Sequence, residues 1–142
     1  MTQPLLKILN LTAHYGVSQA LFDVNLTILP GQVVALMGRN GMGKTTTVNV
    51  VCGLLGRTSG EVHVNGHDCG QMASYKIARL GIGLVPEGRR CFANLTVREN
   101  LLVAATQGEW TLEKVCGLLP RLNERLDQYA NTLSGGEQQM LA

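Results

Sequence analysis

The sequence of 142 residues lacks any long apolar stretch, and no run approaches the roughly 18 residues that a membrane-spanning helix needs. Charge is also sparse. The 12 basic and 10 acidic residues leave a formal net charge of +2, too little to indicate a nucleic acid or a membrane surface as partner. The first ten residues have no apolar core of the kind that a secretory signal requires. These absences favour a cytosolic globular protein and leave open membrane association through a partner.

Cysteine pairs at metal-binding or redox spacing are missing too. The four cysteines form no C-x-x-C motif, which favours reduced thiols over disulfides or a metal centre; they are Cys52, Cys69, Cys91 and Cys116. Glycine, in contrast, is abundant. The 17 glycines gather around residues 38–43, 53–60, 81–88 and 135–136, which indicates special loops rather than a low-complexity chain.

The first part of the chain mixes strands with helices. Alternating apolar residues predict strands over 6–15, 20–29 and 60–66, the last closing on the hairpin-type turn Asn65-Gly66. Short apolar runs predict buried strands over 32–38 and 81–85. The intervening helical patterns run from Gly43 to a stop at Gly56 and over 74–80.

The remainder is mostly helical. Thr96 and Glu99 form a capping box in front of a helix over 97–106. Further helices are predicted over 111–119 and 121–130.

The segment from Gly38 to Thr45 fits G-x-x-x-x-G-K-[ST], the phosphate-binding loop. Its glycines let the backbone curl so that consecutive N–H groups point at an anion. The helix that follows adds the positive end of its dipole. Lys44 would contact the β- and γ-phosphates, and the Thr45 hydroxyl would bind Mg²⁺. We therefore predict an ATP site made of Gly38, Arg39, Asn40, Gly41, Met42, Gly43, Lys44, Thr45 and Thr46.

A second motif, Leu133-Ser-Gly-Gly-Glu137, resembles the signature loop of ABC-type ATPases. "GRNGMGKTTT", "LGIGLVPEGRR" and "LTVRENLLVAA" stand in the same order and spacing as in that family, so the resemblance covers essentially the whole chain. It is strongest to the ATP-binding subunit of branched-chain amino-acid importers, the LivF-like type. The fold implied is α/β: a P-loop NTPase (RecA-like) core with an N-terminal antiparallel β subdomain and a helical subdomain. Residues 1–88 would hold the β subdomain and part of the core, and 89–142 the helical subdomain and signature loop.

The resemblance assigns further residues. Tyr15 matches the aromatic residue that stacks on adenine. Glu87 stands where most members carry the glutamine that meets Mg²⁺ and couples the site to the permease. The signature loop would act in trans on ATP bound by a second subunit; in this chain it comprises Ser134, Gly135, Gly136 and Glu137. These last four residues also predict a helix start, since Ser134 and Glu137 form another capping box.

The family's Walker B Asp and Glu and its switch histidine would follow the signature, so we assign no catalytic residue among these 142. His14, His63 and His67 all precede the signature and match none of these roles. We accordingly expect this chain alone to hydrolyse no ATP and to aggregate. We also expect the buried strands over 32–38 and 81–85 to have exposed edges, because the family places the Walker B strand and the next strand between them.

The function implied is that of an importer's ATPase subunit, which binds ATP and Mg²⁺ and drives uptake of branched-chain amino acids. Its partners would be a second ATPase subunit, the membrane permease and, indirectly, a periplasmic binding protein. The ATPase subunit itself would lie at the cytoplasmic face of the inner or plasma membrane, held there by the permease. Three alternatives stay open. They are a urea or amide importer, a nucleotide-binding remnant without catalysis, and a soluble ABC ATPase of DNA repair or translation.

Overall fold

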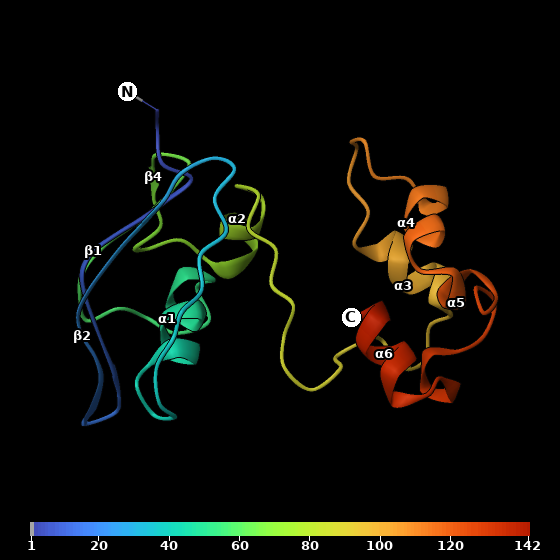
Figure 1. The fold of residues 1–142 in the computed structure, drawn as a ribbon. Helices are drawn as coiled ribbons and strands as arrows, with labels where there is room; N and C mark the ends of the chain where they lie inside the picture. The colour runs from blue at the N-terminus through green and yellow to red at the C-terminus, as the bar shows by residue number, and fades with distance from the viewer. Residues whose placement is uncertain (1) are drawn as a thin grey trace. The chain divides into compact units, whose positions relative to one another are not determined.

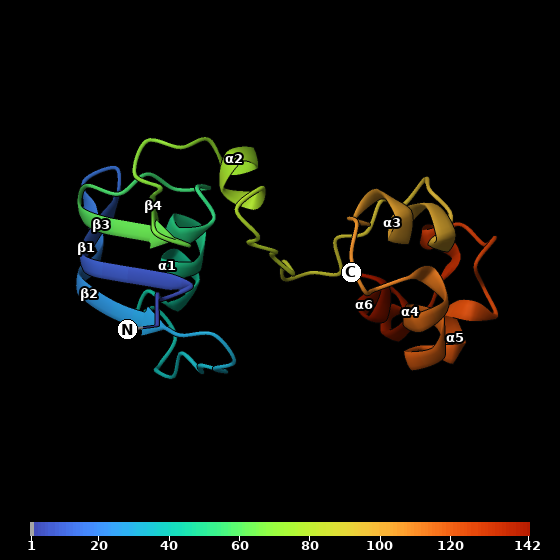
Figure 2. The ribbon, with the colours of Figure 1, turned by 90° about the horizontal axis from the view of Figure 1, so that it is seen from above.

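The computed structural model describes residues 2–142, and the chain divides into two compact units, Met1–Leu84 and Val85–Ala142. Figures 1 and 2 show the elements of each unit. Within residues 2–142, the first unit holds the four strands and two helices, and the second is helical. None of the helices within residues 2–142 combines the length and apolar character that a bilayer crossing requires.

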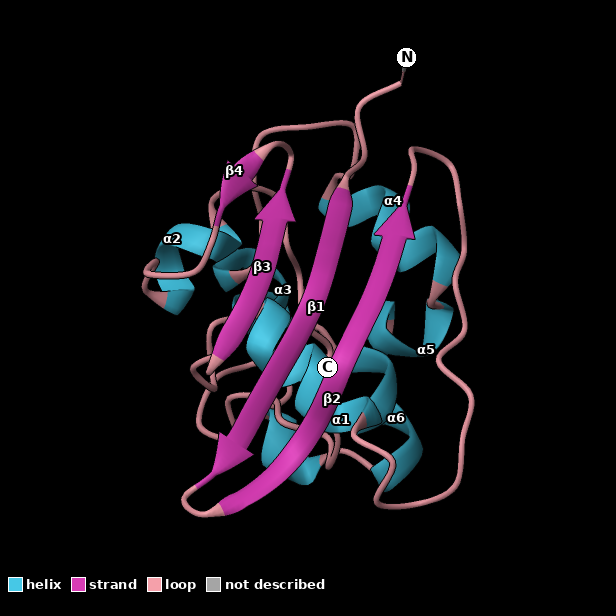
Figure 3. Cartoon of the chain, turned by 90° about the vertical axis from the view of Figure 1, so that its left-hand side faces the viewer, coloured by secondary structure: helices cyan, strands magenta, loops and turns pink. Residues whose placement is uncertain are grey.

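The first unit is built on a four-stranded antiparallel sheet with the order β2-β1-β3-β4. Its strands are β1 (Leu6–Tyr15), β2 (Ser18–Ile28), β3 (Ser59–Val64) and β4 (His67–Asp68). Figure 3 shows the sheet face on, with β1 between β2 and β3. The three strands predicted from alternation are confirmed.

One face of the sheet is buried, and β1 shows how the sequence achieves this. Ile8, Leu11 and Ala13 are all fully buried, although a spacing of three between the first two breaks strict alternation. A register shift in the pairing of β1 absorbs the extra residue. Asn10 adopts φ 46° there, and its amide donates to Asn25 Oδ1 at 3.0 Å. The bulge keeps the apolar side chains on the inner face.

The turn between β3 and β4 is the one that its sequence predicts. Asn65 and Gly66 have φ values of 48° and 79°, as a two-residue hairpin turn with two left-handed residues requires. The Asn65 side chain also donates to the carbonyl oxygen of Leu80 at 2.7 Å. The turn is thereby tied to the segment that follows α2 (Ser74–Ala78).

Helix α1 (Lys44–Val51) packs on the buried face of the sheet through Val50 and Val51, which join the core with Ile8 and Leu11. The predicted stop at Gly56 is wrong, since α1 ends five residues earlier. Gly53 is the residue with a left-handed φ, 68°. Its amide donates to Val50 O, and a Cβ there would lie 2.8 Å from Ile77 Cδ1. Close packing against α2 therefore requires glycine at position 53, two residues after α1 ends, where the chain leaves the helix.

The two predicted buried strands are not formed within residues 2–142. Residues 32–39 and 82–86 have no regular secondary structure, and neither segment pairs with a strand. Their apolar side chains are largely exposed, with Val33 at 100%, Met37 at 91% and Val85 at 67%. A strand of this kind is stabilised by neighbours on both sides, and neither segment has one here.

The second unit consists of short helices around a small core. They are α3 (Val97–Val103), α4 (Leu112–Leu118), α5 (Pro120–Asn123), the 3₁₀ turn η1 (Ala130–Thr132) and α6 (Gly135–Leu141). Val97, Leu122 and Ala130 are fully buried in this core, with Leu133 and Leu141 beside them. The predicted helix over 121–130 is mostly wrong, because α5 ends at Asn123 and turns follow.

Candidate functional site

The phosphate-binding sequence forms an irregular loop in front of α1. Gly38, Gly41 and Gly43 have φ values of 155°, 84° and 82°, which side chains with a Cβ rarely adopt. Gly43 is also buried against β2, since an added Cβ would lie 2.5 Å from Leu21 Cδ2 and 2.9 Å from Ala20 O. The glycine thus lets the start of α1 approach the sheet closely and fixes where the loop ends.

Lys44, the first residue of α1, turns back over this loop. Its ammonium donates to the carbonyl oxygens of Gly38 at 2.6 Å and Arg39 at 2.9 Å. The charged group is therefore held at the mouth of the loop that the glycines shape. A phosphate arriving there would find a cation already in place.

The start of α1 offers the remaining groups that a phosphate requires. The first amides of a helix have no intrahelical acceptor, and here they belong to Lys44, Thr45 and Thr46. Thr45 is exposed, which suits a hydroxyl that binds Mg²⁺. The Thr46 side chain is buried, so its contact with a nucleotide would use the backbone amide. The donor set fits a magnesium-bound phosphate.

Tyr15 ends β1 and is half exposed, at 50%. Tyr15 pairs with Ser18 across the β1–β2 turn. Ser18 comes two residues before Ala20, whose carbonyl oxygen Gly43 approaches, so Tyr15 belongs to the strand pair that contacts the end of the phosphate loop. The ring is therefore free to take a stacking partner. Its role towards adenine stays a prediction.

Glu87 is exposed and lies in the second unit, ahead of two left-handed residues. Gly88 and Arg89 have φ values of 87° and 54°. Thr45 belongs to the first unit, so the magnesium site predicted for Thr45 and Glu87 together remains a prediction.

The signature residues form the predicted capping box at the start of α6. The Ser134 amide donates to Glu137 Oε2 at 2.8 Å, and the Glu137 amide donates to Ser134 Oγ at 3.4 Å. Hydrogen bonds with the Ser134 hydroxyl and then its amide, helped by the charge of Arg125, hold the pKa of Glu137 below its usual value. Thr96 and Glu99 form an equivalent box at the start of α3. Both predicted boxes are confirmed.

Two arginines beside α6 were not found by sequence reasoning. Arg125 Nε lies 2.7 Å from Glu137 Oε1, and the Arg89 guanidinium packs against Gly135. Neither spacing follows a helical or strand period, so no local pattern signals these contacts.

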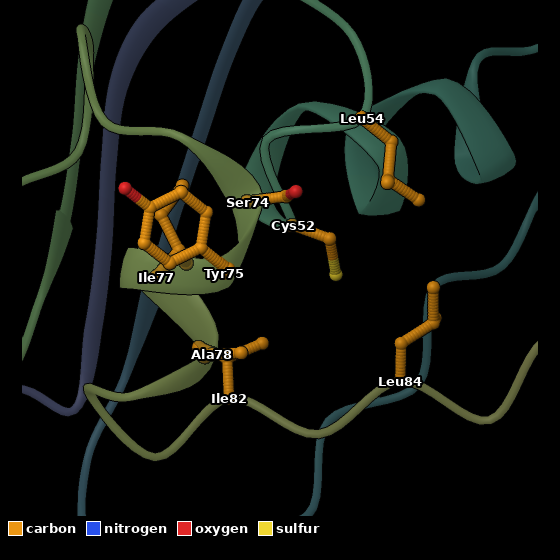
Figure 4. Close-up of a pocket in the computed structure, with 8 residues that line it drawn as sticks. All are labelled: Cys52, Leu54, Ser74, Tyr75, Ile77, Ala78, Ile82 and Leu84. Carbon is orange, nitrogen blue, oxygen red and sulfur yellow. The ribbon is translucent and has the colours of Figure 1, made fainter.

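An open pocket of about 250 Å³ lies elsewhere in the first unit (Figure 4). The Cys52 thiol points into it, and burial raises the pKa of this thiol. The residues that line the pocket are mostly apolar, and none belongs to the phosphate loop. They are Cys52, Leu54, Ser74, Tyr75, Ile77, Ala78, Ile82 and Leu84. The pocket is therefore separate from the candidate nucleotide site. All four cysteines are free, and within residues 2–142 no group of three His, Cys, Asp or Glu side chains is placed to hold a metal ion.

Comparison with known families decides the assignment. Residues 21–142 match the family model described as ABC transporter. The chain belongs to the ABC transporter ATP-binding family. Members bind nucleotide, and the family activity is ATP hydrolysis coupled to transport.

Two similar curated proteins are subunits of amino-acid transporters. The chain is 43% identical over 136 residues to the high-affinity branched-chain amino acid transport ATP-binding protein BraG of Pseudomonas aeruginosa, covering 92% of the chain and 58% of BraG. It is 37% identical over 143 residues to the probable branched-chain amino acid transport ATP-binding protein LivF of Archaeoglobus fulgidus, covering 97% of the chain and 61% of LivF. The chain thus spans about three fifths of the length of these relatives.

Solved structures agree on the fold. The ATP-binding subunit of an ABC transporter superposes with a TM-score of 0.80 at 29% identity, over 96% of this chain and 59% of that one. The ADP conformation of MJ1267, an ATP-binding cassette of an ABC transporter, superposes with a TM-score of 0.76 at 26% identity, over 99% of this chain and 63% of that one. The α/β fold expected from the sequence is confirmed as a partial ABC ATPase domain.

Proposed function

We propose that this chain belongs to the ATP-binding subunit of an importer that takes up branched-chain amino acids. The observation that carries the proposal is the loop over residues 38–45, in which left-handed glycines, a helix start and the Lys44 ammonium converge. The similarity to BraG and LivF supports the choice of cargo.

In this function, the loop from Gly38 and the start of α1 bind the phosphates of ATP. Lys44 neutralises the β- and γ-phosphates, and the Thr45 hydroxyl, with Glu87, holds Mg²⁺. Tyr15 stacks on the adenine. The magnesium ion would supply charge stabilisation for the transferred phosphoryl group.

The partners follow from the same assignment. A second ATPase subunit would place its bound ATP against the signature residues Ser134–Glu137 of this one. A membrane permease would receive the resulting motion, and a periplasmic binding protein would deliver the cargo to it. The subunit would then lie at the cytoplasmic face of the membrane, held there by the permease.

Nucleotide binding is tested by titrating the full-length protein with Mg-ATP in a calorimeter, beside its variants Lys44→Ala and, as the control, Lys7→Ala. Lys7 is an exposed residue of β1 outside the phosphate loop. We expect heat of binding from the unsubstituted chain and Lys7→Ala, and none from Lys44→Ala. Absence of binding in all three would reject the nucleotide site.

Cargo is tested with the full-length protein reconstituted with its permease and binding protein in vesicles. ATP-dependent uptake of leucine but not urea is the expected result. Uptake of urea in place of leucine would reject the branched-chain assignment and leave the nucleotide site intact.

A further inference from the structure

Glu137 differs from the other acidic residues that form ion pairs within residues 2–142. Its side chain is only 12% exposed, whereas the acidic partners in the other pairs are 55–87% exposed. Most exposed pairs contribute little, because water screens them. A largely buried carboxylate depends much more on its partner.

The two oxygens of this carboxylate have separate tasks. Oε2 accepts the Ser134 amide at 2.8 Å and so closes the capping box at the start of α6. Oε1 lies 2.7 Å from Arg125 Nε. Because a charged acceptor binds an amide more strongly than a neutral one, keeping Glu137 ionised strengthens its hold on Ser134.

Arg125 is itself well placed to hold this carboxylate. It follows α5, its amide donates to Leu122 O, and its Nη1 donates to Gln128 Oε1 at 3.1 Å. Leu122 is fully buried in the core of the second unit. The backbone of Arg125 is thus tied to a packed element, and Gln128 holds its guanidinium from the other side.

We propose that Arg125 is a positioning residue for ATP hydrolysis: through its ion pair with Glu137 it holds Ser134, Gly135 and Gly136 in the geometry that reaches the nucleotide of a second subunit. The inference rests on the proposed function, in which these signature residues act in trans. Arg125 itself touches neither nucleotide nor water in this role. Its loss would misplace the start of α6, and small displacements of groups around a reacting centre have large effects on rate.

The test uses the full-length protein with the variants Arg125→Gln, Glu137→Gln and their combination, and measures kcat, ATP affinity and thermal midpoint. Arg125→Gln removes only the ion pair, whereas Glu137→Gln removes the ion pair and leaves a neutral acceptor for the Ser134 amide. Arg121→Gln is the matched control, because Arg121 forms an exposed pair with Glu124 in the neighbouring turn. Assays are run well below the lowest unfolding midpoint.

We expect Arg125→Gln to lower kcat about tenfold while ATP affinity stays unchanged. The double variant should match Glu137→Gln alone, because Arg125 has no carboxylate left to pair with once residue 137 is neutral. Arg125→Lys should recover part of the rate, since it restores a positive charge without the fork of the guanidinium. Arg121→Gln should behave as the unsubstituted protein.

An unchanged kcat in Arg125→Gln, with ATP still bound and hydrolysed, would overturn the positioning role and leave the proposed function standing. Additive losses in the double variant, or equal losses of affinity and rate, would also overturn it. Failure of the unsubstituted protein to bind ATP would instead reject the proposed function. The double-mutant cycle in thermal midpoint would still measure the ion pair in that case.

Discussion

The Lys44 ammonium lies 2.6 Å from the carbonyl oxygen of Gly38, so the last part of the phosphate loop is bonded to its first residue. This contact keeps the loop closed on itself and holds the cation where phosphates would arrive. The same side chain therefore serves the loop and the ligand.

Replacing Lys44 by alanine should accordingly abolish Mg-ATP binding and change stability only slightly. The lost hydrogen bonds join exposed groups, and such bonds contribute about 1 kcal/mol or less to the free energy of unfolding. Calorimetric titration measures the first effect and urea unfolding the second. A variant that retains ATP affinity would show that Lys44 does not contact the phosphates.

Gly43→Ala should be strongly destabilising, by about 2 kcal/mol or more in the free energy of unfolding. The added Cβ would collide with Leu21 Cδ2 and the Ala20 carbonyl oxygen, at a backbone φ of 82°. The Ala20 backbone can move aside only by distorting β2. Urea unfolding of the full-length protein measures the difference.

Gly56→Ala is the matched control for this substitution. Gly56 lies close by in the sequence, has no left-handed φ, and nothing stands within 4 Å of its added Cβ. We expect no loss of stability there, and a slight gain from a more restricted unfolded chain. Equal effects of the two substitutions would contradict the packing role of Gly43.

The glycines of the first unit also show which features can be predicted from the sequence and which cannot. The phosphate loop, the hairpin at Asn65-Gly66 and both capping boxes were predicted because each depends on residues close together in the chain. The end of α1 was not. Gly53 and Gly56 look equivalent locally, and the contact of Gly53 with Ile77 decides between them.

The predicted strands over 32–38 and 81–85 are absent from residues 2–142 for a related reason. Their apolar composition suits a buried strand, but a strand exists only when another strand accepts its hydrogen bonds. No strand within residues 2–142 does so. Likewise, the pairing of Arg125 with Glu137 joins residues twelve apart through the turn after α5, and tertiary packing alone creates it.

Acidification should weaken the second unit through its two capping boxes. Hydrogen bonds from Thr96 lower the pKa of Glu99, and those from Ser134 lower the pKa of Glu137. A glutamate whose pKa is lower in the folded than in the unfolded chain stabilises the fold when the pH lies above its unfolded pKa, about 4.3. This stability disappears as the pH falls through the folded pKa. Unfolding midpoints in urea should therefore drop from about pH 5 downwards.

The combined variant Glu99→Gln and Glu137→Gln should be less stable at neutral pH and lose less on acidification. Glu124→Gln serves as the control, since the Glu124 side chain is exposed and takes no part in either capping box. A pH profile of the double variant parallel to that of the unsubstituted chain would show that other carboxylates set the acid response.

Gly135 and Gly136 should respond differently to alanine, although both lie in the first turn of α6. An added Cβ at Gly135 would lie 2.8 Å from Arg89 Cζ, whereas nothing stands within 4 Å of one at Gly136. Alanine normally gains about 1 kcal/mol over glycine in a helix. We expect Gly136→Ala to gain part of this, and Gly135→Ala to gain less because Arg89 must swing away.

Removing Arg89 should erase this difference. In the Arg89→Ala background, both alanine substitutions should shift the urea midpoint by the same amount, because the guanidinium no longer occupies the space beside Gly135. Arg90→Ala provides the comparison, since Arg90 is adjacent in the chain and supplies none of the three atoms nearest to a Cβ at Gly135. If Gly135→Ala stayed less favourable without Arg89, the backbone at the start of α6, rather than the arginine, would be the cause.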